Sequence, residues 1–327
     1  MAHASSLRKR TSVPGKQDAY PTQVKAIDLQ VNGYAGTDFC SHHLTAEELH
    51  TGCEALIADG FDGILATLIT DSVENLVKKL TNLVKLREQD DLAQQVILGF
   101  HVEGPFLNPE PGYIGAHEPQ YVSKANIEDS QRILEAGAGL VKLLTLAPEQ
   151  DEGGKTTKFL AEQGIRVAAG HCNPSLDELQ TGIDAGLTMV THFGNGCPVD
   201  LPRHDNVLQR FLHFRDQLFF SFIPDGAHVP FFALRNYIDQ IGIDRITMTT
   251  DAIAAAGLGP GLHQLSGIEV EVDEQGVARR PGSPNLAGST LTLPRMLKAL
   301  EQGLGLNISE QEQVLVVNPA TLLNLSS

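Results

Sequence analysis

The sequence has no tryptophan, and it is poor in aromatic residues, cysteine and long apolar runs. Its four cysteines, Cys40, Cys53, Cys172 and Cys197, are too few and too scattered for a disulfide framework. No apolar run reaches the ~18 residues that a membrane span needs, and the N-terminus lacks the apolar core of a secretory signal. These absences argue against disulfide-stapled and membrane-spanning classes, and we expect a soluble, cytoplasmic protein.

Positive charge is also scarce, because 24 Lys and Arg stand against 40 Asp and Glu and give a formal net charge of −16. Such a chain has little attraction for nucleic acid or anionic membranes, and we expect neither as a partner. Only the N-terminus differs, with five basic residues and one acid in the first 25. We interpret residues 1–24 as a flexible, solvated basic tail and residues 25–327 as one large domain.

Apolar residues make up 42% of the chain, which is ample for a large core. They gather in eight short continuous runs separated by amphipathic stretches, the pattern of parallel strands covered on both faces. Helix-capping boxes stand between them at Thr45–Glu48, Ser175–Glu178 and Ser309–Glu312. Eight such units predict an α/β fold of the (β/α)8 barrel type, because the alternative, a doubly wound sheet, seldom needs eight. The apolar runs lie at 25–33, 63–70, 96–104, 140–147, 166–171, 189–195, 218–225 and 246–252.

One segment departs from this pattern. Residues 263–280 alternate apolar and acidic positions in the stretch IEVEV and then reach the turn sequence DEQG. Alternation followed by turn residues predicts a β-hairpin, which is inserted ahead of the last barrel helix.

Polar side chains stand near the ends of most of these runs. In a barrel the carboxyl ends of the strands converge on one face, where active sites are built. A lone histidine at a strand end is usually a hydrogen-bonded core residue, but polar residues at the ends of so many strands indicate a shared site. These residues are Gln30, Asn32, His101, Glu103, His171, His192, Asp225, His228 and Asp251.

Three of them, Glu103, His171 and His192, offer one carboxylate and two imidazoles. This set is typical of a catalytic zinc site, which keeps a coordination position for water, and iron or manganese would accept it too. A divalent ion there would lower the pKa of water toward ~7. Asp251 is then the carboxylate that takes the proton from water and passes it to the leaving group. The alternative for Asp251 is that it caps a helix over the following segment.

Two cysteines lie close to these histidines in sequence, Cys172 beside His171 and Cys197 five residues after His192. As metal ligands they would make a closed, structural site. We interpret them instead as small packing residues, because their offset from the histidines does not require them to point inward.

The motifs around these residues occur along nearly the whole chain after residue 25. They are IDLQVNG (27–33), HVEGPFLN (101–108), GAH (115–117), AAGHCNPS (168–175), THFGNG (191–196), PDGAHV (224–229), TDAIAAAG (250–257), LAGSTLTL (286–293) and NPA (318–320). In this order the sequence resembles the N-acetylglucosamine-6-phosphate deacetylase family of the amidohydrolase superfamily. HVEGPFLN with DGAH and TDA downstream separates that family from the dihydroorotases, ureases and aminoacylases of the same superfamily.

The resemblance implies a barrel that hydrolyses the acetamide of N-acetylglucosamine 6-phosphate to glucosamine 6-phosphate and acetate, in amino-sugar catabolism. It implies that Glu103, His171 and His192 hold the metal and that Asp251 is the catalytic aspartate. Beside the metal, His117 is expected to polarise the acetyl carbonyl. The resemblance implies sugar and phosphate contacts from Ala116, His117, Asn195, Gly196, Arg203, Asp225, His228, Leu286, Ala287 and Gly288.

The sequence departs from the family at several places. Gln30 and Asn32 stand where many amidohydrolases have a His-x-His that binds a second metal, so we expect one divalent ion per chain, zinc before iron or manganese. Arg203 has the spacing of the family's phosphate arginine, and its planar guanidinium suits a phosphate. Residues 204–206 differ from the family's Glu-Pro-Gly, which leaves the sugar epimer and the need for a phosphate open. The family's β-sandwich domain is expected to be largely absent, and the resemblance also implies a homodimer.

Two other functions remain open at this point. One is a deacetylase or other amidohydrolase with a different substrate, and the other is a non-catalytic barrel that binds a sugar phosphate as a sensor. Asp251 argues against the sensor, because binding alone needs no proton-transfer carboxylate. Acetate release from N-acetylglucosamine 6-phosphate, measured with and without a chelator, separates these hypotheses.

Overall fold

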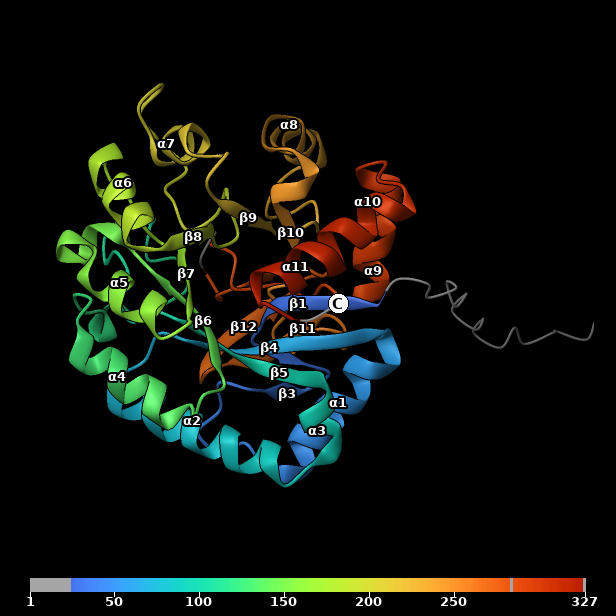
Figure 1. Cartoon of the computed structure of the whole chain (residues 1–327). Coiled ribbons are helices and arrows are strands. Elements are labelled where there is room, and N and C mark those ends of the chain that lie inside the picture. The colour runs from blue at the N-terminus through green and yellow to red at the C-terminus, as the bar shows by residue number, and fades with distance from the viewer. Residues whose placement is uncertain (1–24, 283–284, 326–327) are drawn as a thin grey trace, which may run out of the picture.

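Eight parallel strands form the centre of the molecule, and helices surround them (Figure 1). The computed structural model describes residues 25–282 and 285–325, so the predicted basic tail lies outside the described residues. Strand neighbours follow the chain order, as in a (β/α)8 barrel, and the predicted fold is confirmed. Each predicted apolar run overlaps one barrel strand, although β4 and β8 each begin two residues before their runs: β1 (Ala26–Val31), β4 (Phe61–Ile69), β5 (Ile97–Glu103), β6 (Val141–Leu146), β7 (Arg166–Ala169), β8 (Leu187–Val190), β9 (Phe219–Phe222) and β10 (Ile246–Met248).

The helices begin at residues that can cap them. The predicted capping boxes at Thr45–Glu48 and Ser175–Glu178 are both present, in α1 and α6. The third box lies two residues before the predicted one, because Asn307 accepts from the backbone N–H of Glu310 and so starts α10 ahead of Ser309. The helices are α1 (Ala46–Asp59), α2 (Val73–Glu88), α3 (Asp91–Val96), α4 (Ile127–Ala136), α5 (Lys155–Glu162), α6 (Leu176–Ala185), α7 (Val207–His213), α8 (Phe231–Ile241), α9 (Leu293–Lys298), α10 (Ile308–Glu312) and α11 (Asn318–Leu322).

Apolar side chains fill one end of the barrel interior. Leu322 of α11 packs with Ile27 and Leu29 of β1 in a buried cluster that also takes in residues of β4, β6, β7 and β8. Figure 1 shows α11 lying beside β1. Because this end is filled, the space for a site lies at the carboxyl ends of the strands.

The segment after β10 builds a small sheet of its own. β11 (Gly261–Leu265) and β12 (Ile268–Val272) are antiparallel, and β13 (Ala278–Arg279) adds a third strand after the predicted DEQG turn. The insertion is therefore a three-stranded sheet rather than the predicted hairpin. The extra turn is at Ser266 and Gly267, whose φ angles of 51° and 82° fit the tight turns that join antiparallel strands.

This small sheet packs against the mouth of the barrel. Leu265, Val270 and Ala278 share a buried cluster with Ile69 at the end of β4. A second short ladder, β2 (Gly33–Tyr34) with β3 (Thr37–Asp38), follows β1 directly. Both small sheets therefore stand next to the carboxyl ends of the barrel strands.

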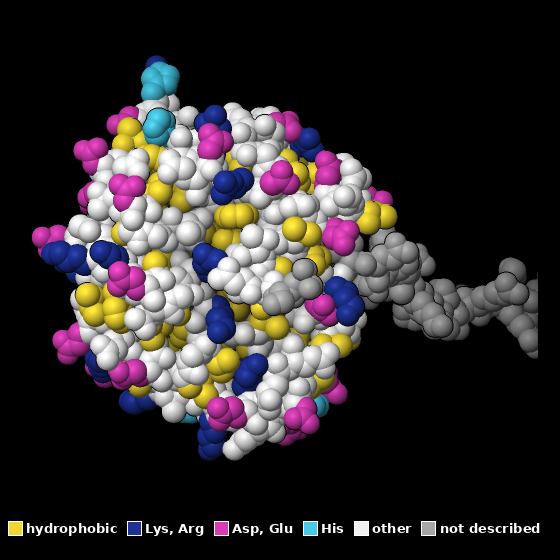
Figure 2. All heavy atoms as spheres, in the orientation of Figure 1, with side chains coloured by type: hydrophobic (Ala, Val, Ile, Leu, Met, Phe, Trp, Pro, Cys, Tyr) yellow, Lys and Arg dark blue, Asp and Glu magenta, His cyan; other side chains and the backbone are white. Residues whose placement is uncertain are grey.

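Two further observations concern the outer surface. Among the residues that the structure describes, no helix is both long enough and apolar enough to cross a membrane. On the face shown in Figure 2, acidic and basic side chains are interspersed.

Candidate active site

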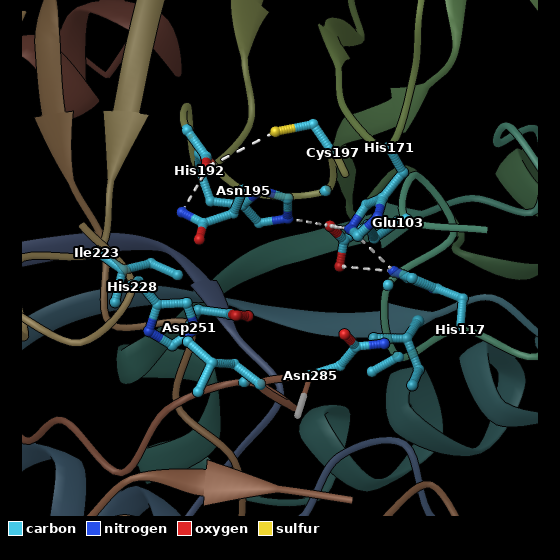
Figure 3. Close-up of a pocket in the computed structure, with 18 of the residues that line it drawn as sticks. Glu103, His117, His171, His192, Asn195, Cys197, Ile223, His228, Asp251 and Asn285 are labelled. Atoms are coloured by element: carbon cyan, nitrogen blue, oxygen red, sulfur yellow. Dashed lines mark hydrogen bonds and ion pairs between the residues drawn. The ribbon is translucent and has the colours of Figure 1, made fainter. Parts of the chain in front are cut away.

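A cavity of about 430 Å³ opens at the carboxyl ends of the barrel strands. Side chains that follow five different strands line it: Asn32 after β1, Glu103 at the end of β5, His171 after β7, His192 after β8 and Asp251 after β10. Figure 3 shows Glu103 and the surrounding histidines pointing toward one another, with Asp251 across the cavity. The structure thus brings together residues that are up to 219 positions apart in the chain.

The Glu103 carboxylate lies at the centre of the histidine cluster and is 2% exposed. Its Oε1 is 2.8 Å from His192 Nε2 and 3.3 Å from His171 Nε2, and its Oε2 accepts a hydrogen bond of 3.1 Å from Gln30 Nε2. Burial alone would raise the pKa of Glu103, but the hydrogen bonds from His171 and His192 hold it well below its usual value. Glu103 is therefore an anion, as a metal ligand must be.

His171 is held in one orientation. Its Nδ1 donates to the carbonyl oxygen of Tyr113 at 2.8 Å, so Nε2 is the ring nitrogen that faces Glu103 and can serve as a metal ligand. Gly115 and Gly196 both pack against the ring, where an added Cβ would come within 2.8 and 2.9 Å of ring atoms. Both glycines have a φ of 61°, so both space and backbone conformation require glycine there.

The residues present fit a divalent metal. One ligand atom from each of Glu103, His171 and His192 lies within 4.8 Å of the others, and all three side chains are buried. His171 and His192 have positive φ angles of 50° and 31°. This backbone conformation costs a non-glycine residue about 1–3 kcal/mol and occurs most often at functional sites. A carboxylate with two imidazoles suits zinc, iron or manganese.

His117 lies beside the three candidate ligands. Its Nε2 is 3.2 Å from His171 Nε2 and 3.8 Å from Glu103 Oε2. Burial, followed by the neighbouring His171, lowers the pKa of His117 to about 3, so this imidazole is neutral. The backbone N–H of Thr70 donates to Nδ1 at 3.4 Å, so the ring proton lies on Nε2. His117 is therefore a neutral hydrogen-bond donor.

Asp251 lies across the cavity and is 8% exposed. Asn32 Nδ2 donates to its Oδ1 at 2.7 Å, and burial, followed by the negative charge of Glu103, raises its pKa to about 6. A carboxylate with such a pKa can both accept and return a proton near neutral pH. The segment after it forms turns and no helix, so the helix-cap interpretation of Asp251 is not supported.

A second carboxylate–imidazole pair forms another part of the cavity. Asp225 Oδ2 lies 2.7 Å from His228 Nδ1, and Asp225 Oδ1 accepts from the backbone N–H of His228. Burial alone would raise the pKa of Asp225, but its hydrogen bonds with His228 hold it low. Asp225 therefore orients His228, and it is His228, not Asp225, that lines the cavity.

The other predicted binding residues divide into two groups. Ala287 is fully buried and does not line the cavity, whereas Arg203 lies exposed on the loop before α7, between the lining residues Leu201 and Leu208 in sequence but not itself among the lining residues. Cys172 is buried in the main core, whereas Cys197 is half-buried and contributes to the lining. The predicted residues that do line the cavity are Ala116, His117, Asn195, Gly196, His228, Leu286 and Gly288.

Some contacts of the site cannot be read from the sequence. His101 does not line the cavity. Its Nε2 lies within hydrogen-bond distance, 2.8 Å, of Thr145 Oγ1. The Tyr113 carbonyl and the Thr70 N–H are backbone groups, and no side-chain motif identifies them. Asn32, which the sequence placed in the predicted site without a stated role, is the hydrogen-bond partner of Asp251.

The chain is similar in sequence and in fold to proteins of known activity, although no protein-family model matches it. The N-acetylglucosamine-6-phosphate deacetylase of Mus musculus is 31% identical over 314 residues, which is 91% of this chain and 73% of that protein. A mutant N-acetyl-D-glucosamine-6-phosphate deacetylase from Mycobacterium smegmatis, in complex with N-acetyl-D-glucosamine-6-phosphate, superposes with a TM-score of 0.83 at 27% identity, covering 95% of this chain and 82% of that one. The corresponding enzyme of Thermotoga maritima gives a TM-score of 0.81 at 25% identity over the same shares.

Proposed function

The chain belongs to the N-acetylglucosamine-6-phosphate deacetylase family, and from this membership we propose that it hydrolyses the acetamide of N-acetylglucosamine 6-phosphate to glucosamine 6-phosphate and acetate. One observation carries the proposal: Glu103, His171 and His192 form a buried ligand set in the same cavity as Asp251. Metal ligands alone would suit many roles. The additional buried carboxylate across the cavity is what water attack on an amide requires.

Each residue then has a role that follows from its contacts. Glu103, His171 and His192 would hold one divalent ion, for which we propose zinc, and this ion would supply Lewis acidity for activating water and polarising the amide carbonyl. The neutral Nε2–H of His117 donates to the acetyl oxygen as negative charge develops there. Asp251 accepts a proton from the attacking water and returns it to the amide nitrogen as the C–N bond breaks. His228, oriented by Asp225, contacts the sugar.

The ligand set predicts the metal content of the protein. We expect about one tightly bound divalent ion per chain, because Gln30 and Asn32 are bonded to Glu103 and Asp251 rather than offering imidazoles for a second site. Elemental analysis of the purified protein measures this ratio. A value of two per chain, or metal retained in the double variant Glu103→Ala, His171→Ala, would contradict the assignment.

The phosphate of the substrate needs a cation that the cavity wall does not supply. Among the described residues that line the cavity there is no lysine or arginine. Arg203 is exposed on a loop that also carries Val199, which is fully exposed. We therefore place the chain in a homodimer in which Arg203 of one subunit reaches the phosphate bound in the other. The exposed apolar Val199 on the same loop also lines the cavity, so a subunit contact at this loop would lie next to the bound substrate.

Arg203→Ala is expected to lower kcat/KM for the phosphorylated sugar by ~10², because a bidentate guanidinium–phosphate contact is lost. Activity on unphosphorylated N-acetylglucosamine should change little. Initial rates on the two substrates measure this difference. If both substrates lose activity together, Arg203 supports the fold or the dimer rather than binding a phosphate.

A mixing experiment tests the dimer. Arg203→Ala and Asp251→Asn variants, each weakly active, should regain activity when their subunits are exchanged, because one mixed site then has both residues. Co-purification of two differently tagged variants confirms that mixed dimers form. Unchanged low activity in proven mixed dimers would place Arg203 in the cavity of its own chain.

Acetate release from N-acetylglucosamine 6-phosphate, abolished by a chelator and restored by zinc, tests the main proposal. A second candidate function is deacetylation of an unphosphorylated N-acetylated sugar, which the lack of lysine and arginine among the described lining residues favours. A higher kcat/KM on the unphosphorylated sugar would select that candidate.

A further inference from the structure

Strand β1 holds the segment that carries Asp251. β1 and β10 stand at the two ends of the sheet order, and within the described residues they share no ladder. The contact between these two ends of the barrel includes the single pair Val31–Ala252 and a set of side-chain hydrogen bonds. Residues 249–252 are held on one side by β1 and on the other by Phe222 of β9 and by Ser289, which contact their backbone.

The main hydrogen-bonding group that β1 presents to residues 249–252 is a buried carboxylate. Asp28 is 1% exposed, and it accepts hydrogen bonds from Thr249 Oγ1 and from the backbone N–H of Thr250 at 2.8 Å. It also accepts from the backbone N–H of Gln30, at 3.0 Å, which fixes the carboxylate within its own strand. Asp28 thus supplies acceptors where a regular ladder would supply backbone carbonyls.

The next residues of the segment are held from β1 as well. Asn32 Nδ2 donates to Asp251 Oδ1, and the backbone N–H of Asn32 donates to Ala252 O at 2.7 Å. Between these anchors, Asp251 has a φ of 49°. A non-glycine residue keeps this conformation only where its surroundings enforce it.

We propose that Asp28 is a positioning residue, which acts through Thr249 and Thr250 to place the Asp251 carboxylate for proton transfer. Asp28 does not line the cavity, so it reaches the reaction only through the segment that it binds. Asn32 then determines which Asp251 oxygen accepts the proton. Because Oδ1 already accepts a hydrogen bond from the Asn32 amide, Oδ2 is the oxygen available to the water proton. This role for Asp28 rests on the proposed deacetylation, in which Asp251 moves the proton.

Two threonines near each other on β10 and its extension give a matched test. Thr249 and Thr247 are both fully buried, but Thr249 donates to Asp28, whereas Thr247 Oγ1 has no hydrogen-bond partner among the described residues. Thr249→Val removes the contact with Asp28 and is expected to lower kcat about tenfold or more with KM nearly unchanged. Thr247→Val should leave both constants unchanged. Thr249→Ser keeps the hydroxyl and should restore most of the lost turnover.

A double-mutant cycle separates positioning from general destabilisation. In an Asp251→Asn background, Thr249→Val should cause little further loss of kcat, because the carboxylate that it places is already gone. Asp28→Asn should behave like Thr249→Val. Additive losses, a parallel rise in KM, or an equal effect of Thr247→Val would overturn the proposal.

Hydrogen exchange tests the same inference without any activity measurement. Thr249→Val and Asp28→Asn should speed amide exchange in a peptide covering residues 246–253, relative to the wild type and to Thr247→Val. If the wild type releases no acetate, the proposed function is wrong. Unchanged amide hydrogen exchange in both variants would show, independently of that, that Asp28 does not hold the segment.

Discussion

Asp251→Asn is expected to lower kcat by ~10² or more, because the amide cannot accept the proton of the attacking water. The substitution should preserve the local structure. Oδ1 at position 251 still accepts from Asn32 Nδ2, and asparagine tolerates the φ of 49° at least as well as aspartate. Metal content should therefore stay at the wild-type level. Steady-state acetate release and elemental analysis of the same sample measure the two quantities.

A buried aspartate away from the cavity serves as the control. Asp151 accepts from the backbone N–H groups of Thr156 and Thr157 at the start of α5, and it does not line the site. Asp151→Asn should reduce thermal stability slightly and leave kcat unchanged. If Asp251→Asn keeps near-wild-type turnover, another residue accepts the proton. If the variant loses both turnover and metal, the loss of kcat reports the missing metal rather than proton transfer.

The architecture could be predicted from the sequence because hydrophobic patterning and capping act locally. Eight continuous apolar runs can only be buried if both faces of each strand are covered, and a barrel does this. The prediction was wrong where a short polar signal decided the structure. The third capping box moved to Asn307, and the Ser266–Gly267 turn added a strand to the predicted hairpin.

The site was predictable only in part, because residue type and position along a strand show which side chains converge but not what each one contacts. Glu103, His171 and His192 do meet. The bond from Asn32 to Asp251 spans 219 positions, and the groups that orient His117 and His171 belong to the backbone. The exposure of Arg203 also depends on a loop conformation that no local pattern specifies.

Glu103→Gln is expected to have the largest effect on metal binding. The variant keeps the shape of the side chain but loses the negative charge that lies 2.8 Å from His192 and 3.3 Å from His171. We expect metal affinity to fall by more than the ~10–100-fold seen when only a residue that orients a ligand is lost. Without the ion, several kcal/mol of transition-state stabilisation disappear, which lowers acetate release by about 10³.

Thermal unfolding with and without zinc measures this loss independently of catalysis. In the wild type, zinc at 100 times its Kd should stabilise the fold by about 2.7 kcal/mol, and Tm should rise accordingly. Glu103→Gln should show almost no rise. Glu149→Gln is the matched control, because Glu149 is half-buried and is bonded to Asn108 and to the backbone N–H of Asn173, outside the cavity lining. It should keep the metal, the zinc-dependent Tm and the activity. If Glu103→Gln retained all three as well, the Glu103 carboxylate would not be a ligand of the ion, and the proposed ligand set would be wrong.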